Sequence, residues 1–365
     1  MGEKESILSE DSKITFGAQV FFSAPVKISS LDLLSELKRT YPSLQFDDDP
    51  FFHLLKVLEM DRVIDTSATK MELLLSGATE NTAESEGMLD SMSVTVRAAF
   101  EGSDFPSELS EESKSRCRVE NPNLYLDLMQ QRIMFRDVDT VIPEIKSGIE
   151  VFVTARDTDL RGRIRAATLC SCLIAVIARR EEALAVFWST AGHFLTPAAA
   201  IAMAGSASAV SPSLPVSHWI GARLIPFDIN GSRGSQVSSV GLTKFTGYEF
   251  WMAACAIPPE NAFSFFYEAL GELTMKGNLV MDGECIDISK RGSEDGSSFA
   301  AGTWYAHWFK PGTLGQDYLF LVLFRSDCPQ PVLDQFGLKS PGERLSPDDK
   351  FPGKDAYRNA LDKLI

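Results

Sequence analysis

The clearest hydrophobic pattern lies in the middle of the chain. Residues 148–154 are mostly apolar and predict a buried strand. A helix is expected to follow as far as about Arg180, with an apolar run at 166–178. Asp157 or Asp159 can cap the start of that helix, because a carboxylate accepts hydrogen bonds from the free N–H groups there. A second apolar run at 183–188 predicts another buried strand. Together these segments predict a β-α-β unit.

The first quarter of the chain predicts a strand followed by a helix. Residues 14–23 favour a strand, and Ser29 or Ser30 can cap the helix. Tyr41 precedes a proline, which pushes its backbone out of the α region and ends the helix. The apolar face expected for this helix consists of Leu31, Leu34 and Leu37. We also expect strands at 71–75 and 92–98 and a helix within 109–135 that starts at Asn121.

The second half of the chain is rich in predicted strands. A helix is expected at 197–204, begun by Thr196 and stopped by Gly205. Small polar residues with two prolines at 206–215 predict a domain boundary. Strands are then expected at 216–225, 237–244, 248–257, 303–309 and 318–324, with a turn at 230–235 and a helix opening at Pro258. The apolar face of that helix is expected to be Phe263, Phe266, Tyr267 and Leu270.

This order of elements predicts an α+β fold with mixed α/β layers, a β-α-β unit in the first half and an antiparallel, strand-rich second half. We expect an α/β domain at 1–205 with an acidic loop insertion at 76–113, and a strand-rich α+β domain at 206–327. A proline-rich, charged tail is expected at 328–365, with a short helix near 356–364.

Charge and cysteine content narrow the function classes. The chain has 365 residues, a net charge of −15 and six cysteines. Nucleic-acid binding is disfavoured, because it depends on lysine and arginine displacing counterions from phosphates. The acidic surface favours a basic protein partner or solubility alone. The charged N-terminal residues and the shortness of the apolar runs predict a cytoplasmic location and no membrane association. The sparse, irregular cysteines predict reduced thiols packed in the core.

The residues that could carry chemistry have no recognisable companions in the sequence. The histidines are His53, His193, His218 and His307. None lies in a metal-ligand spacing, and we expect no metal and no cofactor. Gly205-Ser206-Ala207-Ser208-Ala209 lacks the second glycine of a nucleophile elbow, and the glycine-rich stretch at 231–235 lacks the lysine of a phosphate loop. Structural or surface roles are therefore the main interpretation for each histidine.

Two groups of residues are candidates for binding. Arg161, Arg163 and Arg165, together with Arg156, lie where the central helix is expected to begin, and such a place can hold an anion or an acidic partner. The alternative is that Asp157 and Asp159 offset these charges. The second group consists of Trp304, His307 and Trp308, which could form an exposed aromatic interface or pack in the core.

Three segments resemble a bacterial family, domain of unknown function 4261. The first is Ala183-Leu184-Ala185-Val186-Phe187-Trp188 with Gly192, His193 and Pro197. The second is Leu214-Pro215-Val216 with Trp219, Gly221 and Arg223, continuing to Val240-Gly241-Leu242, Phe245 and Glu249, and the third is 282–286. The similarity covers about residues 150–290. The chain departs from the family after Glu249, where Phe250 and Trp251 replace a second acidic residue, so a carboxylate pair is not expected there.

The resemblance implies a bacterial origin and a companion of other proteins. The leading hypothesis is a non-catalytic protein-binding factor, such as an immunity or antitoxin-like protein that blocks a basic toxin. A second hypothesis is a hydrolase or transferase with a polar site formed by His193, Arg223, Glu249 and Asp282, whose side chains could supply a base, an anion clamp and acids. A structural scaffold without a small-molecule site is the third.

Overall fold

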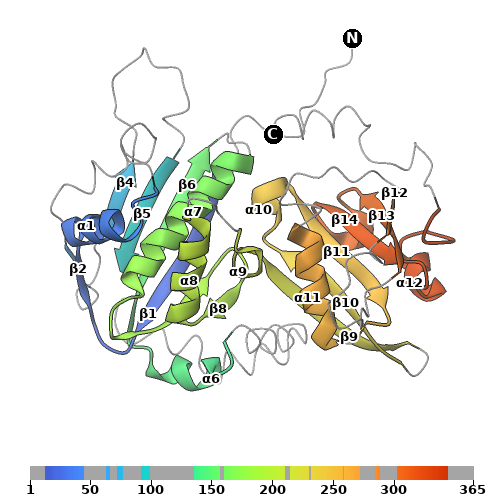
Figure 1. Ribbon diagram of the computed structural model, residues 1–365, viewed down its shortest axis with the longest axis horizontal. Helices are drawn as coiled ribbons and strands as arrows, with labels where there is room; N and C mark the ends of the chain where they lie inside the picture. The colour runs from blue at the N-terminus through green and yellow to red at the C-terminus, as the bar shows by residue number, and fades with distance from the viewer. Residues whose placement is uncertain are drawn as a thin grey trace, which may run out of the picture. The chain divides into compact units, whose positions relative to one another are not determined.

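The chain divides into two compact units, Met1–His218 and Trp219–Ile365 (Figure 1). The computed structural model describes residues 13–44, 63–65, 72–76, 92–98, 135–156, 160–209, 214–229, 232–257, 259–271, 284–287 and 302–343. The predicted helices within 109–135 and at 356–364 and most of the predicted acidic insertion lie outside these residues. The sequence placed a boundary at 206–215, and the division by contacts falls after His218.

The first unit contains a six-stranded sheet in the order β4-β5-β6-β1-β7-β8. Its strands are β1 (Lys13–Phe22), β4 (Glu72–Ser76), β5 (Met92–Ala98), β6 (Ser147–Arg156), β7 (Ala183–Trp188) and β8 (His193–Leu195). Every neighbouring pair is antiparallel. Since β6 and β7 both run antiparallel to β1, which lies between them, they run parallel to each other. The β-α-β unit is therefore confirmed in a split form, with the N-terminal strand inserted between its two strands.

Helix α7 (Leu160–Ile177) forms the crossover between β6 and β7. All of its side chains from Ala166 to Ile177 are buried, because it lies between the sheet strands β1 and β6 and the helices α1 (Ser30–Thr40) and α8 (Pro197–Ala207). A helix that is covered on all sides has no need of a polar face. This explains why its sequence is an apolar run rather than an amphipathic pattern.

Helix α1 begins as predicted, and one residue of its expected apolar face differs. The hydroxyl of Ser29 accepts a hydrogen bond from the N–H of Asp32 at 3.1 Å, and Tyr41 is the C-cap. Leu33 is buried, whereas Leu31 is 41% exposed. Leu31 was wrongly assigned because it precedes the first full turn, where the i, i+3 spacing does not yet fix which side chain meets the core.

Short elements complete the first unit. They are β2 (Lys27–Ser29), which pairs with β3 (Val63–Asp65), then α6 (Val138–Val141) and the 3-10 turn η3 (Ile142–Glu144). Helix α8 starts at Pro197 as predicted, with the Thr196 side chain as its cap, but it continues through Gly205 to Ala207. No atom lies within 4 Å of a Cβ placed on Gly205, so this glycine lowers helix propensity without ending the helix.

The second unit contains a mixed six-stranded sheet in the order β12-β13-β14-β11-β10-β9. Its strands are β9 (Gly221–Ile229), β10 (Ser232–Val240), β11 (Tyr248–Cys255), β12 (Glu284–Asp287), β13 (Thr303–Phe309) and β14 (Leu319–Arg325). All pairs are antiparallel except β11 with β14, which is parallel. The α+β class is thus confirmed. Residues 216–219, predicted as strand, instead form the short helix α9 (Val216–Trp219).

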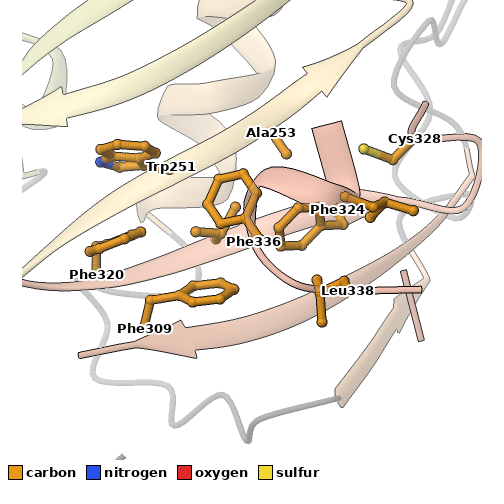
Figure 2. Close-up of a cluster of buried hydrophobic side chains, with 10 residues drawn as sticks. Trp251, Ala253, Phe309, Phe320, Phe324, Cys328, Phe336 and Leu338 are labelled. Carbon is orange, nitrogen blue, oxygen red and sulfur yellow. The ribbon is translucent and has the colours of Figure 1, made fainter. Parts of the chain in front are cut away.

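Aromatic side chains cover both faces of the second sheet. On one face, helix α11 (Pro259–Leu270) packs against the sheet, with Phe265 stacked on Trp304 at a centroid distance of 4.9 Å. On the other face, Phe336 contacts Phe309 and Phe324 at 5.1 and 5.0 Å (Figure 2). Every residue of β11 is buried as a result.

The segment predicted as a charged tail takes part in this core. Helix α12 (Gln330–Gln335) and the residues after it contribute Leu333, Phe336 and Leu338 to the cluster shown in Figure 2. Prolines and charges dominate the composition of this segment, and three apolar side chains spaced by two or three residues are enough to anchor it.

Candidate functional site

His193 is the first candidate residue, and a tight turn positions it. Gly192 has a φ of +68°, a conformation that side chains with a Cβ rarely adopt, and its N–H bonds the carbonyl of Trp188 at 2.9 Å. The turn reverses the chain so that β8 pairs with β7 and His193 lies opposite Trp188. The imidazole of His193 is only 6% exposed.

The imidazole of His193 is committed to a backbone hydrogen bond. Its Nε2 lies 3.0 Å from the carbonyl oxygen of His218. A carbonyl oxygen only accepts hydrogen bonds, so Nε2 carries a proton and donates it. Burial lowers the pKa of His193 to about 4, against a weaker opposing effect of this hydrogen bond. Burial also lowers the pKa of His218. At neutral pH His193 is therefore a neutral donor to the His218 carbonyl, near the end of α9 (Val216–Trp219).

Glu249, the second candidate residue, is a buried carboxylate held by four donors. The Ser239 hydroxyl donates to Oε2, and the Gly241 N–H donates to Oε1 at 3.0 Å. The N–H and hydroxyl of Thr243 donate to Oε1 at 3.3 and 3.2 Å. The Ser239 hydroxyl in turn accepts the N–H of Phe250 at 2.7 Å. The carboxylate thus closes the turn between β10 and α10 (Thr243–Thr246).

Burial and hydrogen bonding act on Glu249 in opposite directions. Burial raises the pKa of the Glu249 carboxyl, and the donors from Ser239, Thr243 and Gly241 oppose that rise. Carboxylates with this many donors keep most of their lone pairs occupied. Little hydrogen-bonding capacity remains for a substrate proton.

The Tyr318 hydroxyl lies within electrostatic range of both Glu249 and Arg223 in the second unit. Burial is the main cause that raises the pKa of the Tyr318 hydroxyl, the Glu249 charge raises it further, and Arg223 lowers it. Neither Tyr318 nor Ser239 was singled out by the sequence, because their proximity arises from the parallel pairing of β11 with β14 and from the β10–β11 hairpin. No local spacing signals either contact.

The four residues of the predicted polar site are not all brought together in one unit. His193 belongs to the first unit, and Arg223 and Glu249 belong to the second. Asp282 lies outside the described residues. Within the second unit, the structure adds Tyr318 to Arg223 and Glu249.

The predicted aromatic interface is instead part of the core. Trp304 and His307 are 0% exposed and Trp308 is 6% exposed. The Nε2–H of His307 donates to the carbonyl of Pro341 at 2.7 Å, and the Trp308 ring meets Tyr248 edge-on at 4.8 Å. These side chains are buried because α11 and the segment after α12 cover opposite faces of β13, so core packing, the other interpretation, is the correct one.

The arginines at the start of α7 differ in exposure. Arg161 and Arg165 are exposed, and Arg163 is 8% exposed. Asp157 and Asp159, the expected caps and counter-charges, lie outside the described residues, as does the side chain of Arg156. Binding of an anion by these arginines stays a prediction.

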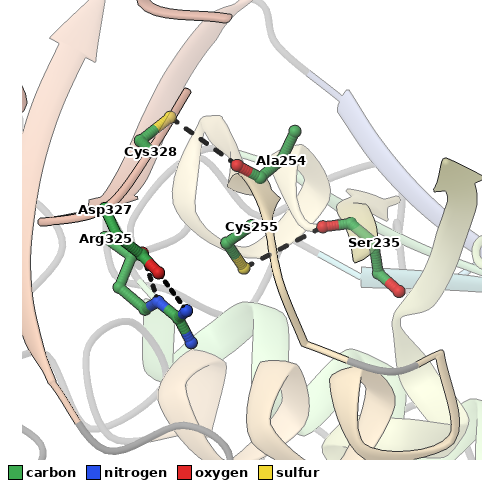
Figure 3. A network of polar contacts seen from close by, with 6 residues as sticks. All are labelled: Ser235, Ala254, Cys255, Arg325, Asp327 and Cys328. Carbon is green, nitrogen blue, oxygen red and sulfur yellow. Dashed lines mark hydrogen bonds and ion pairs between the residues drawn. The ribbon is translucent and has the colours of Figure 1, made fainter. Parts of the chain in front are cut away.

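The cysteines of the described chain are mostly core thiols, as predicted. Cys170, Cys172, Cys255 and Cys328 are buried thiols outside disulfides, whereas Cys285 is exposed. In Figure 3 the thiols of Cys255 and Cys328 donate to the carbonyls of Ser235 and Ala254, beside the ion pair of Arg325 with Asp327. Burial raises the pKa of Cys172, Cys255 and Cys328 to about 12. These thiols remain protonated and serve packing.

The described part of the chain contains neither a metal-binding cluster nor a membrane-spanning helix. No group of three His, Cys, Asp or Glu side chains there is arranged to hold a metal ion. None of the helices in that part is long and apolar enough to cross a membrane.

Comparisons with protein-family models, with curated proteins and with solved structures returned no match. The resemblance to domain of unknown function 4261 therefore stays a prediction.

Proposed function

We propose that this chain is a non-catalytic protein-binding factor of the immunity or antitoxin type, which binds and blocks a basic protein. The observation that carries the proposal is the structural role of Glu249. Its carboxylate accepts four hydrogen bonds that close a turn. His193 and His307 are likewise committed to backbone carbonyls. The residue types that could catalyse thus serve structure at these positions.

The net charge supports a basic partner. A charge of −15 produces a negative potential that attracts a positively charged protein and speeds its association. The attraction weakens as salt screens it, with a Debye length of about 10 Å at 0.1 M and about 3 Å at 1 M.

The test is affinity capture of the tagged chain from its native host at about 0.05 M and about 0.5 M salt. We expect one basic protein in stoichiometric amount at low salt and less of it at high salt. The matched control is an unrelated protein with the same tag and a similar net charge, which should not retain that protein. Absence of a stoichiometric partner at both salt concentrations contradicts the proposal.

A hydrolase or transferase is the second candidate function. The observation in its favour is that the Tyr318 phenol lies within electrostatic range of both a carboxylate, Glu249, and a cation, Arg223. The purified chain is incubated with nitrophenyl acetate and nitrophenyl phosphate as generic ester substrates. Turnover that is lost in a folded Arg223→Gln variant supports an enzyme, and absence of turnover in the wild type speaks against these two reactions.

A further inference from the structure

The loop between β13 and β14 contains Leu314, whose backbone conformation and solvent-exposed side chain are both unfavourable for the folded state. Leu314 has a φ of +51° and a ψ of +27°, and it is the one non-glycine residue with positive φ in the described part of the chain. The left-handed region is unfavourable for leucine because its Cβ crowds the following carbonyl. Glycine or asparagine would adopt this conformation at lower cost.

The side chain of Leu314 does not recover that cost by packing. It is 41% exposed, and Leu31 is the only other large hydrophobic side chain of the described residues that is comparably exposed. Leu31 differs because it lies at the start of helix α1 with an ordinary backbone. An exposed leucine alone requires no explanation, whereas exposure combined with a strained backbone indicates a role outside the fold.

Hydrogen bonds hold the loop in this shape. The N–H of Gly312 bonds the carbonyl of Gln316 at 2.6 Å, and the N–H of Gln316 bonds the carbonyl of Thr313 at 3.0 Å. The N–H of Gly315 bonds the carbonyl of Gly312 at 3.3 Å. Gly312 and Gly315 also have positive φ, and no atom lies within 4 Å of a Cβ placed on either. The apolar side chain is therefore presented at a defined position on an ordered turn.

We propose that Leu314 is the apolar anchor that inserts into a pocket of the basic partner, an inference that rests on the proposed function. The charge that attracts the partner comes from the whole chain, because the loop contributes one exposed cation, Lys310, and one exposed anion, Asp317. What the loop adds is a preorganised apolar contact. Anchors of this kind mainly slow dissociation, whereas long-range charge mainly speeds association.

The experiment compares three variants in binding to the captured basic protein after purification. Leu314→Asn keeps the left-handed backbone accessible and removes the apolar contact, so we expect affinity at least about tenfold weaker through faster dissociation, with an unchanged dependence on salt. Leu314→Met retains an apolar side chain of similar volume and should stay within about threefold of wild type. Leu31→Gln is the matched control, because it removes an equally exposed leucine elsewhere, and should bind as wild type does.

Stability and self-association complete the test. Thermal unfolding of Leu314→Asn should occur at the same or a higher temperature than in the wild type, because asparagine tolerates positive φ. Wild-type affinity in Leu314→Asn, a clear loss of its stability, or a change in self-association alone each overturns the assignment while leaving the proposed function intact. Failure of the wild type to capture a basic protein overturns both.

Discussion

At Glu249 the chain places a carboxylate where water cannot solvate it and offsets the cost with four donors from Ser239, Gly241 and Thr243. The sequence pointed to this residue as a candidate acid, and the signal was its place in a segment that resembles domain of unknown function 4261. Its role could not be predicted, because the donors come from a turn whose geometry depends on the β10–β11 hairpin.

Removing the Glu249 carboxylate should destabilise the fold much more than neutralising it. Glu249→Ala leaves the partly buried N–H groups of Gly241 and Thr243 without their acceptor, and we expect a loss of about 3 kcal/mol in the free energy of unfolding. Glu249→Gln keeps one acceptor and removes a buried charge, so its loss should be below about 1.5 kcal/mol. Denaturant titration measures both. Glu268→Ala, an exposed position of α11, serves as control with a change within about 0.5 kcal/mol. Equal losses in the Ala and Gln variants would contradict this account.

His193 should make the stability of the fold sensitive to acid. Its pKa falls from about 6.5 in the unfolded chain to about 4 when buried. Between these values the unfolded state binds more protons, so stability is fully present above about pH 6.5 and decreases as the pH falls toward 4. The decrease attributable to this residue is about 3 kcal/mol.

The pH dependence is measured as the difference between wild type and His193→Gln in denaturant titrations at about pH 7, 5.5 and 4.5. Glutamine can donate to the His218 carbonyl and does not titrate. The advantage of the wild type should shrink as the pH falls. A constant difference over this range would show that His193 does not titrate with a lowered pKa.

At the scale of elements, hydrophobic pattern and caps predicted most of the described structure. The strand at 183–188, the strand at 92–98 and the start of α8 at Pro197 were all correct, because each has a local cause in alternation, apolar run length or the placement of proline in a first helical turn. The short helix α9 was missed since four residues are too few for a helical period to show. The insertion of β1 between β6 and β7 is a long-range pairing that no local pattern encodes.

The cap of α1 provides a direct test of these local causes. Ser29→Ala removes the acceptor of the Asp32 N–H, and we expect a loss of about 1 kcal/mol. Ser35→Ala, on the exposed side of the same helix, should leave stability unchanged or slightly raised because alanine favours helix. Thermal or denaturant unfolding distinguishes the two. A similar effect of both substitutions would mean that the Ser29 hydroxyl does not cap the helix.

At the scale of the whole molecule, charge and aromatic content have separate roles. Trp304, His307 and Trp308 were considered as a possible interface. All three are buried and belong to the core around the second sheet. The composition alone could not distinguish these roles, because burial of β13 depends on α11 and on the segment after α12. The net negative charge is the property on which the proposed recognition of a basic partner rests.

The net charge of −15 should also make the folded state sensitive to salt. Like charges repel in the compact state, and salt screens that repulsion. Raising sodium chloride from about 0.02 M to about 0.5 M should raise the unfolding midpoint by a few degrees. An equal concentration of a non-ionic osmolyte serves as a comparison. A midpoint that falls with salt would indicate that attractive ion pairs, rather than repulsion, dominate the surface.

The measurement that tests the central claim most directly is the affinity of the purified chain for its captured partner as a function of salt, for wild type and Glu249→Gln. A binding factor that uses Glu249 only for its fold predicts affinity that weakens at least about tenfold between 0.05 M and 0.5 M salt, equally in both proteins. A salt-independent affinity, or turnover of a substrate that disappears in Glu249→Gln while the fold persists, would contradict the account.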